Sequence, residues 1–195
     1  MENLIWKTRK TKETEIRVGV CLKGTGESDI QTGIGFLDHM LELFSKHSLI
    51  DLSVKAKGDL NVDEHHTIED IGIVLGEALK ESLGDKKGIQ RYGFLLPMDE
   101  SLTEVAIDLG GRPYLVWNVK FKRENIGEMP TELFEDFFKA LSDNLQANIH
   151  INLKYGRNEH HMAEGIFKAF AKALRFAVDE DPRAKNLLPS TKGKL

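Results

Sequence analysis

The sequence predicts an α+β fold that is internally duplicated, with two similar lobes that each hold a small mixed sheet and two helices. Strand and helix periodicities follow in the same order in both halves of the 195 residues. The string Glu64-His65-His66-Thr67-Ile68-Glu69 at one predicted helix start recurs ninety-five residues later as Glu159-His160-His161-Met162-Ala163-Glu164. Two such lobes bury their apolar helical faces most economically if the helices pack between the sheets.

The first half is expected to contain strands, a short helix, a strand and a long helix. Residues 15–22 alternate between apolar and polar side chains, as a half-buried strand does, and residues 4–8 are the expected neighbouring strand. The short helix, the next strand and the long helix are predicted over residues 36–44, 49–55 and 64–83. Gly84 follows the long helix and is a common type of helix stop.

The second half repeats this order. Its strands are predicted over residues 102–109, 114–121 and 148–153, and its helices over residues 131–145 and 159–178. We therefore expect a single domain of two pseudo-repeats, about residues 1–90 and 91–180, followed by an irregular tail over residues 181–195.

Composition argues against several classes of protein. The single cysteine, Cys21, rules out an intramolecular disulfide framework, and the first residues lack the basic-then-apolar profile of a secretion signal. We therefore expect a cytoplasmic protein. No apolar run approaches the roughly 18 residues of a membrane span, so no membrane partner is expected. A net charge of −4 and a pI near 6.0 give no overall attraction for nucleic acid.

The repeated string places histidine and glutamate four residues apart on a predicted helix. Residues at this spacing share one helical face, so His65 with Glu69, and His160 with Glu164, each present a nitrogen and an oxygen to one point. This geometry chelates a metal. A single string of this kind is more often a surface or capping feature, but its duplication favours a metal site.

The second histidine of each pair predicts a second metal site. Adjacent helical residues are turned by about 100°, so His66 and His161 do not face the first metal. The remaining ligands of the second site would come from His39 and His150. Histidine and carboxylate ligands without cysteine clusters suit manganese, iron or zinc, and octahedral sites with room for a substrate favour manganese.

Two glycines continue the line of these ligands along the long helix of the first half. Gly72 and Gly76 lie on the same face as His65 and Glu69. They either keep that surface clear for a neighbouring chain or ligand, or they permit close helix packing.

A local anion site is also predicted, beginning with Lys168, which lies one helical turn beyond Glu164 on the same face. Other candidate anion-binding residues are Arg91, Arg112, Lys192 and the hydroxyl of Ser190. Each of these charges taken alone is more simply explained as a solvated surface charge. Sequence spacing alone does not bring them together.

Five motifs together resemble the imidazoleglycerol-phosphate dehydratase family. They are Gly35-Phe36-Leu37-Asp38-His39-Met40-Leu41, Asp63-Glu64-His65-His66-Thr67-Ile68-Glu69-Asp70, Gly111-Arg112-Pro113-Tyr114-Leu115, His160-His161-Met162-Ala163-Glu164 and Pro189-Ser190-Thr191-Lys192-Gly193. The resemblance runs from about Arg9 to the C-terminus, with no departure at an expected motif position.

The resemblance implies a function for each candidate residue. Two Mn²⁺ ions per active site are implied, one held by His65, Glu69, His160 and Glu164, the other by His39, His66, His150 and His161. The residues implied for the substrate phosphate are Arg91, Arg112, Lys168, Ser190 and Lys192. Glu13 is implied to contact the reacting end of the substrate. The candidate catalytic residues are Glu13, His39, Glu69 and Glu164.

The implied reaction is the manganese-dependent elimination of water from D-erythro-imidazoleglycerol phosphate to give imidazole-acetol phosphate, a step of histidine biosynthesis. If both ring nitrogens bind metal, the imidazole can become an imidazolate and expel the adjacent hydroxyl to give a diazafulvene. Glu13 is the candidate general acid or base.

Family resemblance also implies an assembly. Members form 24-subunit shells built from trimers with active sites at subunit interfaces, so we expect a closed homo-oligomer. Some relatives are fused to a phosphatase domain, for which 195 residues leave no room, so we expect a monofunctional protein. Two alternatives stay open: a binuclear metallohydrolase, and a metal-organised storage shell without catalysis.

Overall fold

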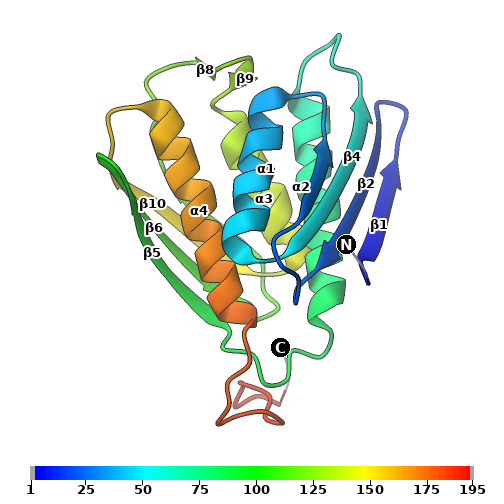
Figure 1. Ribbon diagram of the computed structural model, residues 1–195, viewed down its shortest axis with the longest axis vertical. Coiled ribbons are helices and arrows are strands. Elements are labelled where there is room, and N and C mark those ends of the chain that lie inside the picture. Colours follow the sequence, from blue (N-terminus) through cyan, green and yellow to red (C-terminus); the bar gives the residue numbers. More distant parts are fainter. Residues whose placement is uncertain (1–2, 194–195) are drawn as a thin grey trace.

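Two four-stranded sheets enclose four helices in the part of the chain that the structure, a computed structural model, describes (Figure 1). The described residues are 3–193, without the side chains of residues 93–95. All four helices lie between the two sheets, which confirms the predicted duplicated α+β fold.

The first lobe contributes one sheet and two helices. Its elements are β1 (Ile5–Lys10), β2 (Thr14–Cys21), β3 (Ser28–Gln31), α1 (Gly35–Ser48), β4 (Asp51–Gly58) and α2 (His65–Leu83). The strand order is β1-β2-β4-β3, with only the β3–β4 pair parallel.

The second lobe repeats this topology. Its elements are β5 (Tyr92–Met98), β6 (Ser101–Asp108), β7 (Tyr114–Asn118), the short strands β8 (Asn125–Ile126) and β9 (Met129–Pro130), α3 (Leu133–Leu145), β10 (Asn148–Tyr155) and α4 (Glu159–Val178). The strand order β5-β6-β10-β7 again has one parallel pair, β7 with β10. Each strand of this four-stranded sheet thus has a counterpart in the first sheet, whereas β8 and β9 pair with each other and have none.

Two sheet strands were not predicted, and one predicted strand is too long. β3 and β5 both lie at sheet edges, and the short β3 is mostly exposed, so it shows no apolar alternation. The strand expected over residues 114–121 ends at Asn118, because the chain leaves the sheet there and later forms the β8–β9 hairpin around Gly127. The short helix extends beyond its predicted end to Ser48.

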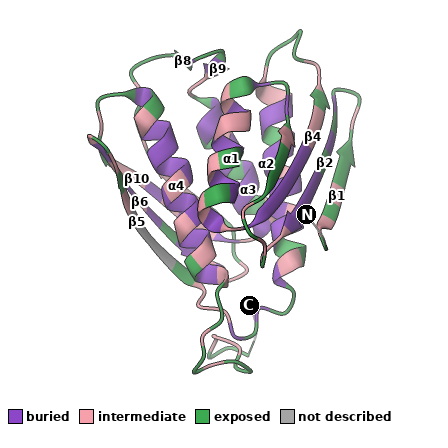
Figure 2. Ribbon diagram, viewed as in Figure 1, coloured by how far each residue is buried: buried purple, intermediate pink, exposed green. Residues whose placement is uncertain are grey.

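One continuous apolar core joins the two lobes. Ile16, Val18 and Val20 of β2 are fully buried, as the alternation of this strand predicts. The same core includes Ile149 and Ile151 of β10, and buried residues line the inner faces of the helices and sheets (Figure 2). α2 packs on the first sheet and α3, while α4 packs on the second sheet and α1.

All four helices begin at the same end of the molecule, the upper end in Figure 1. The repeated His-His pairs open α2 and α4 and therefore lie at this end, which we call the helix-start end. The chain after α4 runs at the opposite end and is tied to the first lobe by an ion pair between Lys23 and Glu180. No helix among the described residues is long and apolar enough to cross a membrane.

Close helix packing accounts for the two glycines of α2. A Cβ atom at Gly72 would lie 2.7 Å from the carbonyl oxygen of Phe137, and one at Gly76 would lie 2.8 Å from the Cβ of Asn144. Both neighbours belong to α3 of the same chain. These glycines therefore allow α2 and α3 to approach each other.

A methyl group at Gly76 should destabilise the protein. Because the Gly76→Ala side chain would meet α3 backbone atoms, we expect a loss of about 1–3 kcal/mol of unfolding free energy. Differential scanning calorimetry should then show a melting temperature lower by roughly 3–10 °C. The matched control is Gly35→Ala, because a Cβ there meets no atom within 4 Å. Equal melting temperatures for the two variants would contradict the packing explanation.

Candidate functional site

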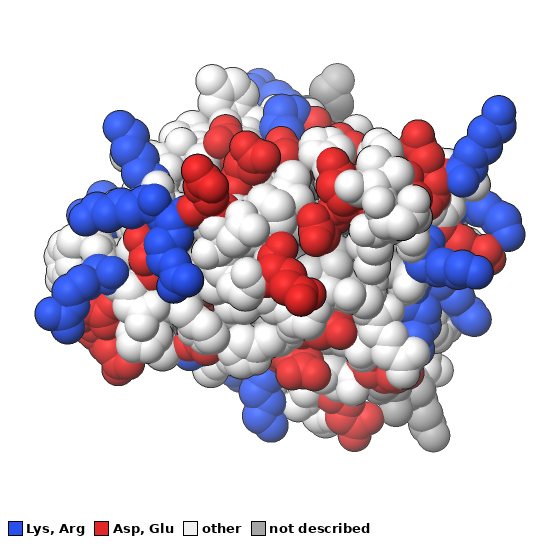
Figure 3. All heavy atoms as spheres, turned by 90° about the horizontal axis from the view of Figure 1, so that it is seen from above, with Lys and Arg blue, Asp and Glu red and all other residues white. Residues whose placement is uncertain are grey.

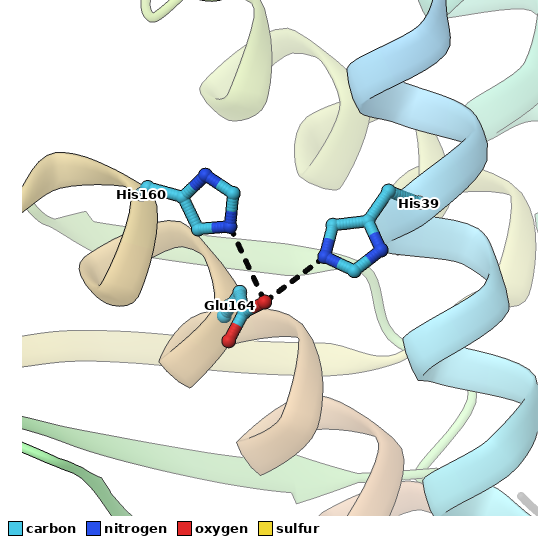
Figure 4. A group of neighbouring side chains, drawn as sticks. All are labelled: His39, His160 and Glu164. Atoms are coloured by element: carbon cyan, nitrogen blue, oxygen red, sulfur yellow. Dashed lines mark hydrogen bonds and ion pairs between the residues drawn. The ribbon is translucent and has the colours of Figure 1, made fainter.

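The carboxylate of Glu164 is the centre of a group at the helix-start end (Figure 4). Its Oε1 atom lies 2.9 Å from Nε2 of His39 and 3.3 Å from Nε2 of His160. Its Oε2 atom accepts a hydrogen bond of 2.9 Å from Nζ of Lys168. The spacing of His160, Glu164 and Lys168 along α4 places all three on one face, as the sequence predicts.

Glu164 is buried but remains ionised. Burial raises the pKa of this carboxyl, but the hydrogen bonds from Lys168 and His39 outweigh it and lower the pKa to about 2. Two imidazole nitrogens therefore converge on an anionic oxygen. These are donor atoms of the type and arrangement that bind Mn²⁺, Fe²⁺ or Zn²⁺, so the residues present fit a divalent metal.

The corresponding group on α2 is more open. Nε2 of His65 lies 3.9 Å from a Glu69 oxygen, and its Nδ1 lies 3.7 Å from a carboxylate oxygen of Asp136 on α3. The Glu69 side chain is 49% exposed, compared with 11% for Glu164. His65 and Glu69 thus share one face of α2, as predicted, but lack the short contacts of the Glu164 group on α4.

The second histidine of each pair contacts a carboxylate from a loop. Nδ1 of His66 lies 3.1 Å from Asp59, and Nδ1 of His161 lies 2.9 Å from Glu100. These hydrogen bonds raise the pKa of both histidines. The bond from His161 lowers the pKa of Glu100 to about 2.

Glu13 lies beside the α2 pair. It sits in the turn between β1 and β2, with its Oε2 atom 4.0 Å from Nε2 of His66. The buried carboxylate of Asp70 on α2 accepts hydrogen bonds from Arg9 and Thr14 on either side of this turn. Asp70 thereby fixes the position of the turn that carries Glu13.

Seen from the helix-start end, several Asp and Glu side chains lie over the middle of the surface, while Lys and Arg lie toward its edges (Figure 3). Carboxylates that contact the histidines here are Glu13, Asp59, Glu69, Asp99, Glu100, Asp136 and Glu164. This surface therefore offers carboxylate oxygens and imidazole nitrogens together, which are ligand atoms for a divalent cation.

The chain by itself does not assemble the two ligand sets that the resemblance implies. In residues 3–193, the groups with three ligand atoms within 4.8 Å of one another are His39, His160 and Glu164, and Asp99, Glu100 and His161. His39 lies with His160 and Glu164, not with the set proposed for it, because α1 packs along α4. His150 points to the outer face of the second sheet, since its neighbours Ile149 and Ile151 are fully buried.

Four of the predicted anion-binding residues line one open cavity of about 790 Å³. They are Arg91, Arg112, Ser190 and Lys192, and we call this space the tail cavity. The guanidinium of Arg91 pairs with Asp108 and donates a 2.7 Å hydrogen bond to the carbonyl of Pro189. Arg91 therefore anchors the tail that carries Ser190 and Lys192.

The tail cavity and the Glu164 group lie at opposite ends of α4. The backbone N–H of Arg91 donates to the carbonyl of Ala177 near the C-terminus of this helix, whereas His160 is in its first turn. At about 1.5 Å per residue, these helix positions are roughly 25 Å apart. Lys168 belongs to the Glu164 group and not to the tail cavity.

Sequence reasoning assigned no role to three residues that hold this site together. Asp59 and Glu100 contact the histidines from loops, and Asp70 fixes the Glu13 turn. The only sequence signal was for Asp70, an acidic residue next to Glu69 on a largely apolar helix. The loop carboxylates depend on tertiary contacts that no local periodicity records.

The chain is similar to known imidazoleglycerol-phosphate dehydratases along most of its length. Residues 32–174 match the family described as imidazoleglycerol-phosphate dehydratase. The protein of that name from Granulibacter bethesdensis is 55% identical over 188 residues, which cover 96% of each chain. A histidine biosynthesis bifunctional protein, HisB, from Spirosoma linguale is 58% identical over 187 residues, which cover 96% of this chain but 49% of that protein. The crystal structure of the Staphylococcus aureus imidazoleglycerol-phosphate dehydratase superposes with a TM-score of 0.83 at 42% identity, covering 92% of this chain and all of the other.

Removing the Arg91 side chain should release the tail. Arg91→Ala loses the hydrogen bond to Pro189, so we expect faster proteolytic cleavage within residues 183–193 and little change elsewhere. Limited trypsin digestion followed by mass spectrometry measures this. Arg112→Ala is the control, because the exposed Arg112 side chain lines the same cavity but forms no hydrogen bond with the described part of the tail. Equal cleavage of both variants would show that Arg91 is not the anchor.

Proposed function

Since this chain belongs to the imidazoleglycerol-phosphate dehydratase family, we propose that it removes water from D-erythro-imidazoleglycerol phosphate with two Mn²⁺ ions per active site. Family membership makes the chain a hydro-lyase of histidine biosynthesis. The metal dependence, the residue roles and the assembly are our proposal. The observation that carries it is the convergence of His39 and His160 on the ionised Glu164 carboxylate.

The proposed metal ligands are the histidines and glutamates of the helix-start end together with His150. They are His39, His65, His66, Glu69, His150, His160, His161 and Glu164. Bound ions would act as Lewis acids and stabilise negative charge on the imidazole ring of the substrate. Lys168 would keep Glu164 ionised and add positive charge beside the ring.

The tail cavity would hold the phosphate of the substrate. Arg112, Ser190 and Lys192 offer cationic and hydroxyl donors there, and the anchored tail keeps them together. Binding the phosphate would fix the diol relative to the metal-bound ring, so remote binding energy is used for orientation.

Glu13 is the proposed general acid or base at the diol. Its carboxylate lies at the helix-start end beside His66, in a turn that Asp70 holds in place. A carboxylate positioned in this way contributes on the order of 10² to 10⁴ in rate. Glu13 would move a proton at the carbon next to the imidazole-bearing one or at the departing hydroxyl.

The active site is proposed to be shared between chains of a homo-oligomer. The roughly 25 Å between the two ends of α4 is farther than a small phosphorylated diol can reach. This separation supports a site in which the helix-start end of one copy meets the tail cavity of another. The assembly we propose is the 24-mer built from trimers that the resemblance implies.

Activity should depend on manganese. We expect metal-stripped protein to give no imidazole-acetol phosphate from imidazoleglycerol phosphate, and added Mn²⁺ to restore product formation, because the ring charge has no other stabiliser of comparable strength. The ketone product and free phosphate are both measured. Phosphate release would support the metallohydrolase alternative. Manganese binding with neither product would support the storage shell.

Mixing two inactive variants should restore activity if the site is shared. His160→Ala removes a metal ligand and Lys192→Ala removes a phosphate donor, so each alone should be nearly inactive. In co-assembled protein with random placement, roughly a quarter of the sites would combine an intact helix-start end with an intact tail cavity. Turnover of the co-expressed mixture measures this fraction.

The control mixture combines two variants that are altered at the same end. His160→Ala and Glu164→Ala both damage the Glu164 group, so every copy in that mixture has a broken helix-start end. It should stay inactive. Recovery in neither mixture, with intact oligomers of both, would place the whole site within one chain.

A further inference from the structure

The ring nitrogens of the two histidines in each pair have different carboxylate partners. The first histidine, His65 or His160, directs Nε2 toward the glutamate four residues later on its own helix. The second, His66 or His161, directs Nδ1 toward a carboxylate outside the helix. The Nδ1 contact of the second histidine is common to both lobes. In the first lobe His65 also places Nδ1 3.7 Å from Asp136, and His66 places Nε2 4.0 Å from Glu13.

The contacts with Nδ1 are made from segments that are not equivalent in the two lobes. Asp59 lies seven residues before His66, in the loop between β4 and α2, and the position seven residues before His161 is Lys154. Glu100 lies in the turn between β5 and β6, and the corresponding turn of the first lobe, between β1 and β2, carries Glu13. Each lobe therefore makes the same contact from a different segment, which points to a requirement of the site rather than to shared ancestry of the loops.

Both carboxylates are held in place for this contact. Oε1 of Glu100 accepts a 2.9 Å hydrogen bond from the backbone N–H of Asn158, the residue whose side chain caps α4. This leaves Oε2 for His161. Both oxygens of Asp59 lie within 3.2 Å of Nδ1 of His66, and its carbonyl accepts from Val62 in a tight turn.

A carboxylate at Nδ1 decides which nitrogen can bind a metal. The carboxylate keeps the Nδ1 proton as a hydrogen-bond donor, so the lone pair of the neutral ring is at Nε2. It also fixes the direction of the ring and makes Nε2 a stronger donor. Nε2 of His66 faces Glu13, on the side where the substrate would react.

We propose that Asp59 and Glu100 are positioning residues of the metal centre, which orient His66 and His161 so that Nε2 of each binds the metal. This inference rests on the proposed function, since it requires the metal. Neither carboxylate touches the metal or the substrate in this role. Each acts through its histidine.

Manganese affinity of the full, metal-stripped protein tests the proposal. Titration with Mn²⁺, followed by electron paramagnetic resonance of the free ion, gives the affinity and the number of ions bound. We expect Asp59→Ala and Glu100→Ala to lower affinity about 10- to 100-fold without changing the number of ions at saturation. Asp59→Asn and Glu100→Gln retain an acceptor oxygen and should fall between these variants and the wild type.

A matched control separates positioning from general effects of charge. Glu104→Gln removes one negative charge from β6, where Glu104 pairs with Lys154, and should leave Mn²⁺ affinity unchanged. The metal-free melting temperatures of the Asn and Gln variants should lie within about 2 °C of the wild type, as for other surface substitutions. If an Ala variant is unstable, its Asn or Gln counterpart supplies the comparison.

Three results would overturn the proposal. Wild-type affinity in both Ala variants would make the contacts ordinary surface ion pairs. Loss of one bound ion at saturation would make the carboxylate a direct ligand. Affinity that falls only in proportion to a lower metal-free melting temperature would make its role structural. A wild-type protein that binds no Mn²⁺ would instead refute the proposed function itself.

Discussion

The common direction of the four helices decides where the functional groups of this chain lie. Each helix returns against the strands of its sheet, so all four begin at one end of the molecule (Figure 1). Helix N-termini carry partial positive charge, which favours carboxylates and disfavours a bare cation. The carboxylates gathered at this end offset that field. They make a surface of helix starts suitable for a metal.

Helix packing makes the α2 group and the α4 group of histidines and carboxylates unequal. α1 packs along α4 and brings His39 to Glu164, whereas α3 packs along α2 and brings Asp136 to His65. The α4 group therefore has two imidazoles around a buried carboxylate, with Lys168 compensating its charge. The α2 group has two carboxylates around one exposed imidazole. The first group is preorganised within the chain, and the second is more exposed.

Local sequence spacing predicted side-chain contacts within one helix, but it did not predict contacts between two helices. The contacts of His160 and Lys168 with Glu164 follow from the helical repeat alone. The contact of His39 with Glu164 spans 125 residues and depends on how α1 packs. Strand alternation, applied to Ile149 and Ile151, would have placed His150 on the outer face of the sheet. His150 was instead expected to be a ligand because its strand precedes the helix of His160 and Glu164. The repeated string drew attention to His160 and Glu164 but gave no indication that His39 lies beside them.

The cationic residues of the tail cavity differ in whether a carboxylate balances their charge. The Arg91 side chain is only 14% exposed, and its positive charge is balanced by Asp108. In residues 3–193, neither Arg112 nor Lys192 has a carboxylate partner, so these two side chains supply the uncompensated positive charge of the cavity. Arg91 helps to place Lys192 at the cavity by holding the carbonyl of Pro189, three residues earlier. The ion pair with Asp108 thus holds Arg91 where it binds the irregular tail. The tail in turn carries Lys192, whose positive charge an anion in the cavity would meet.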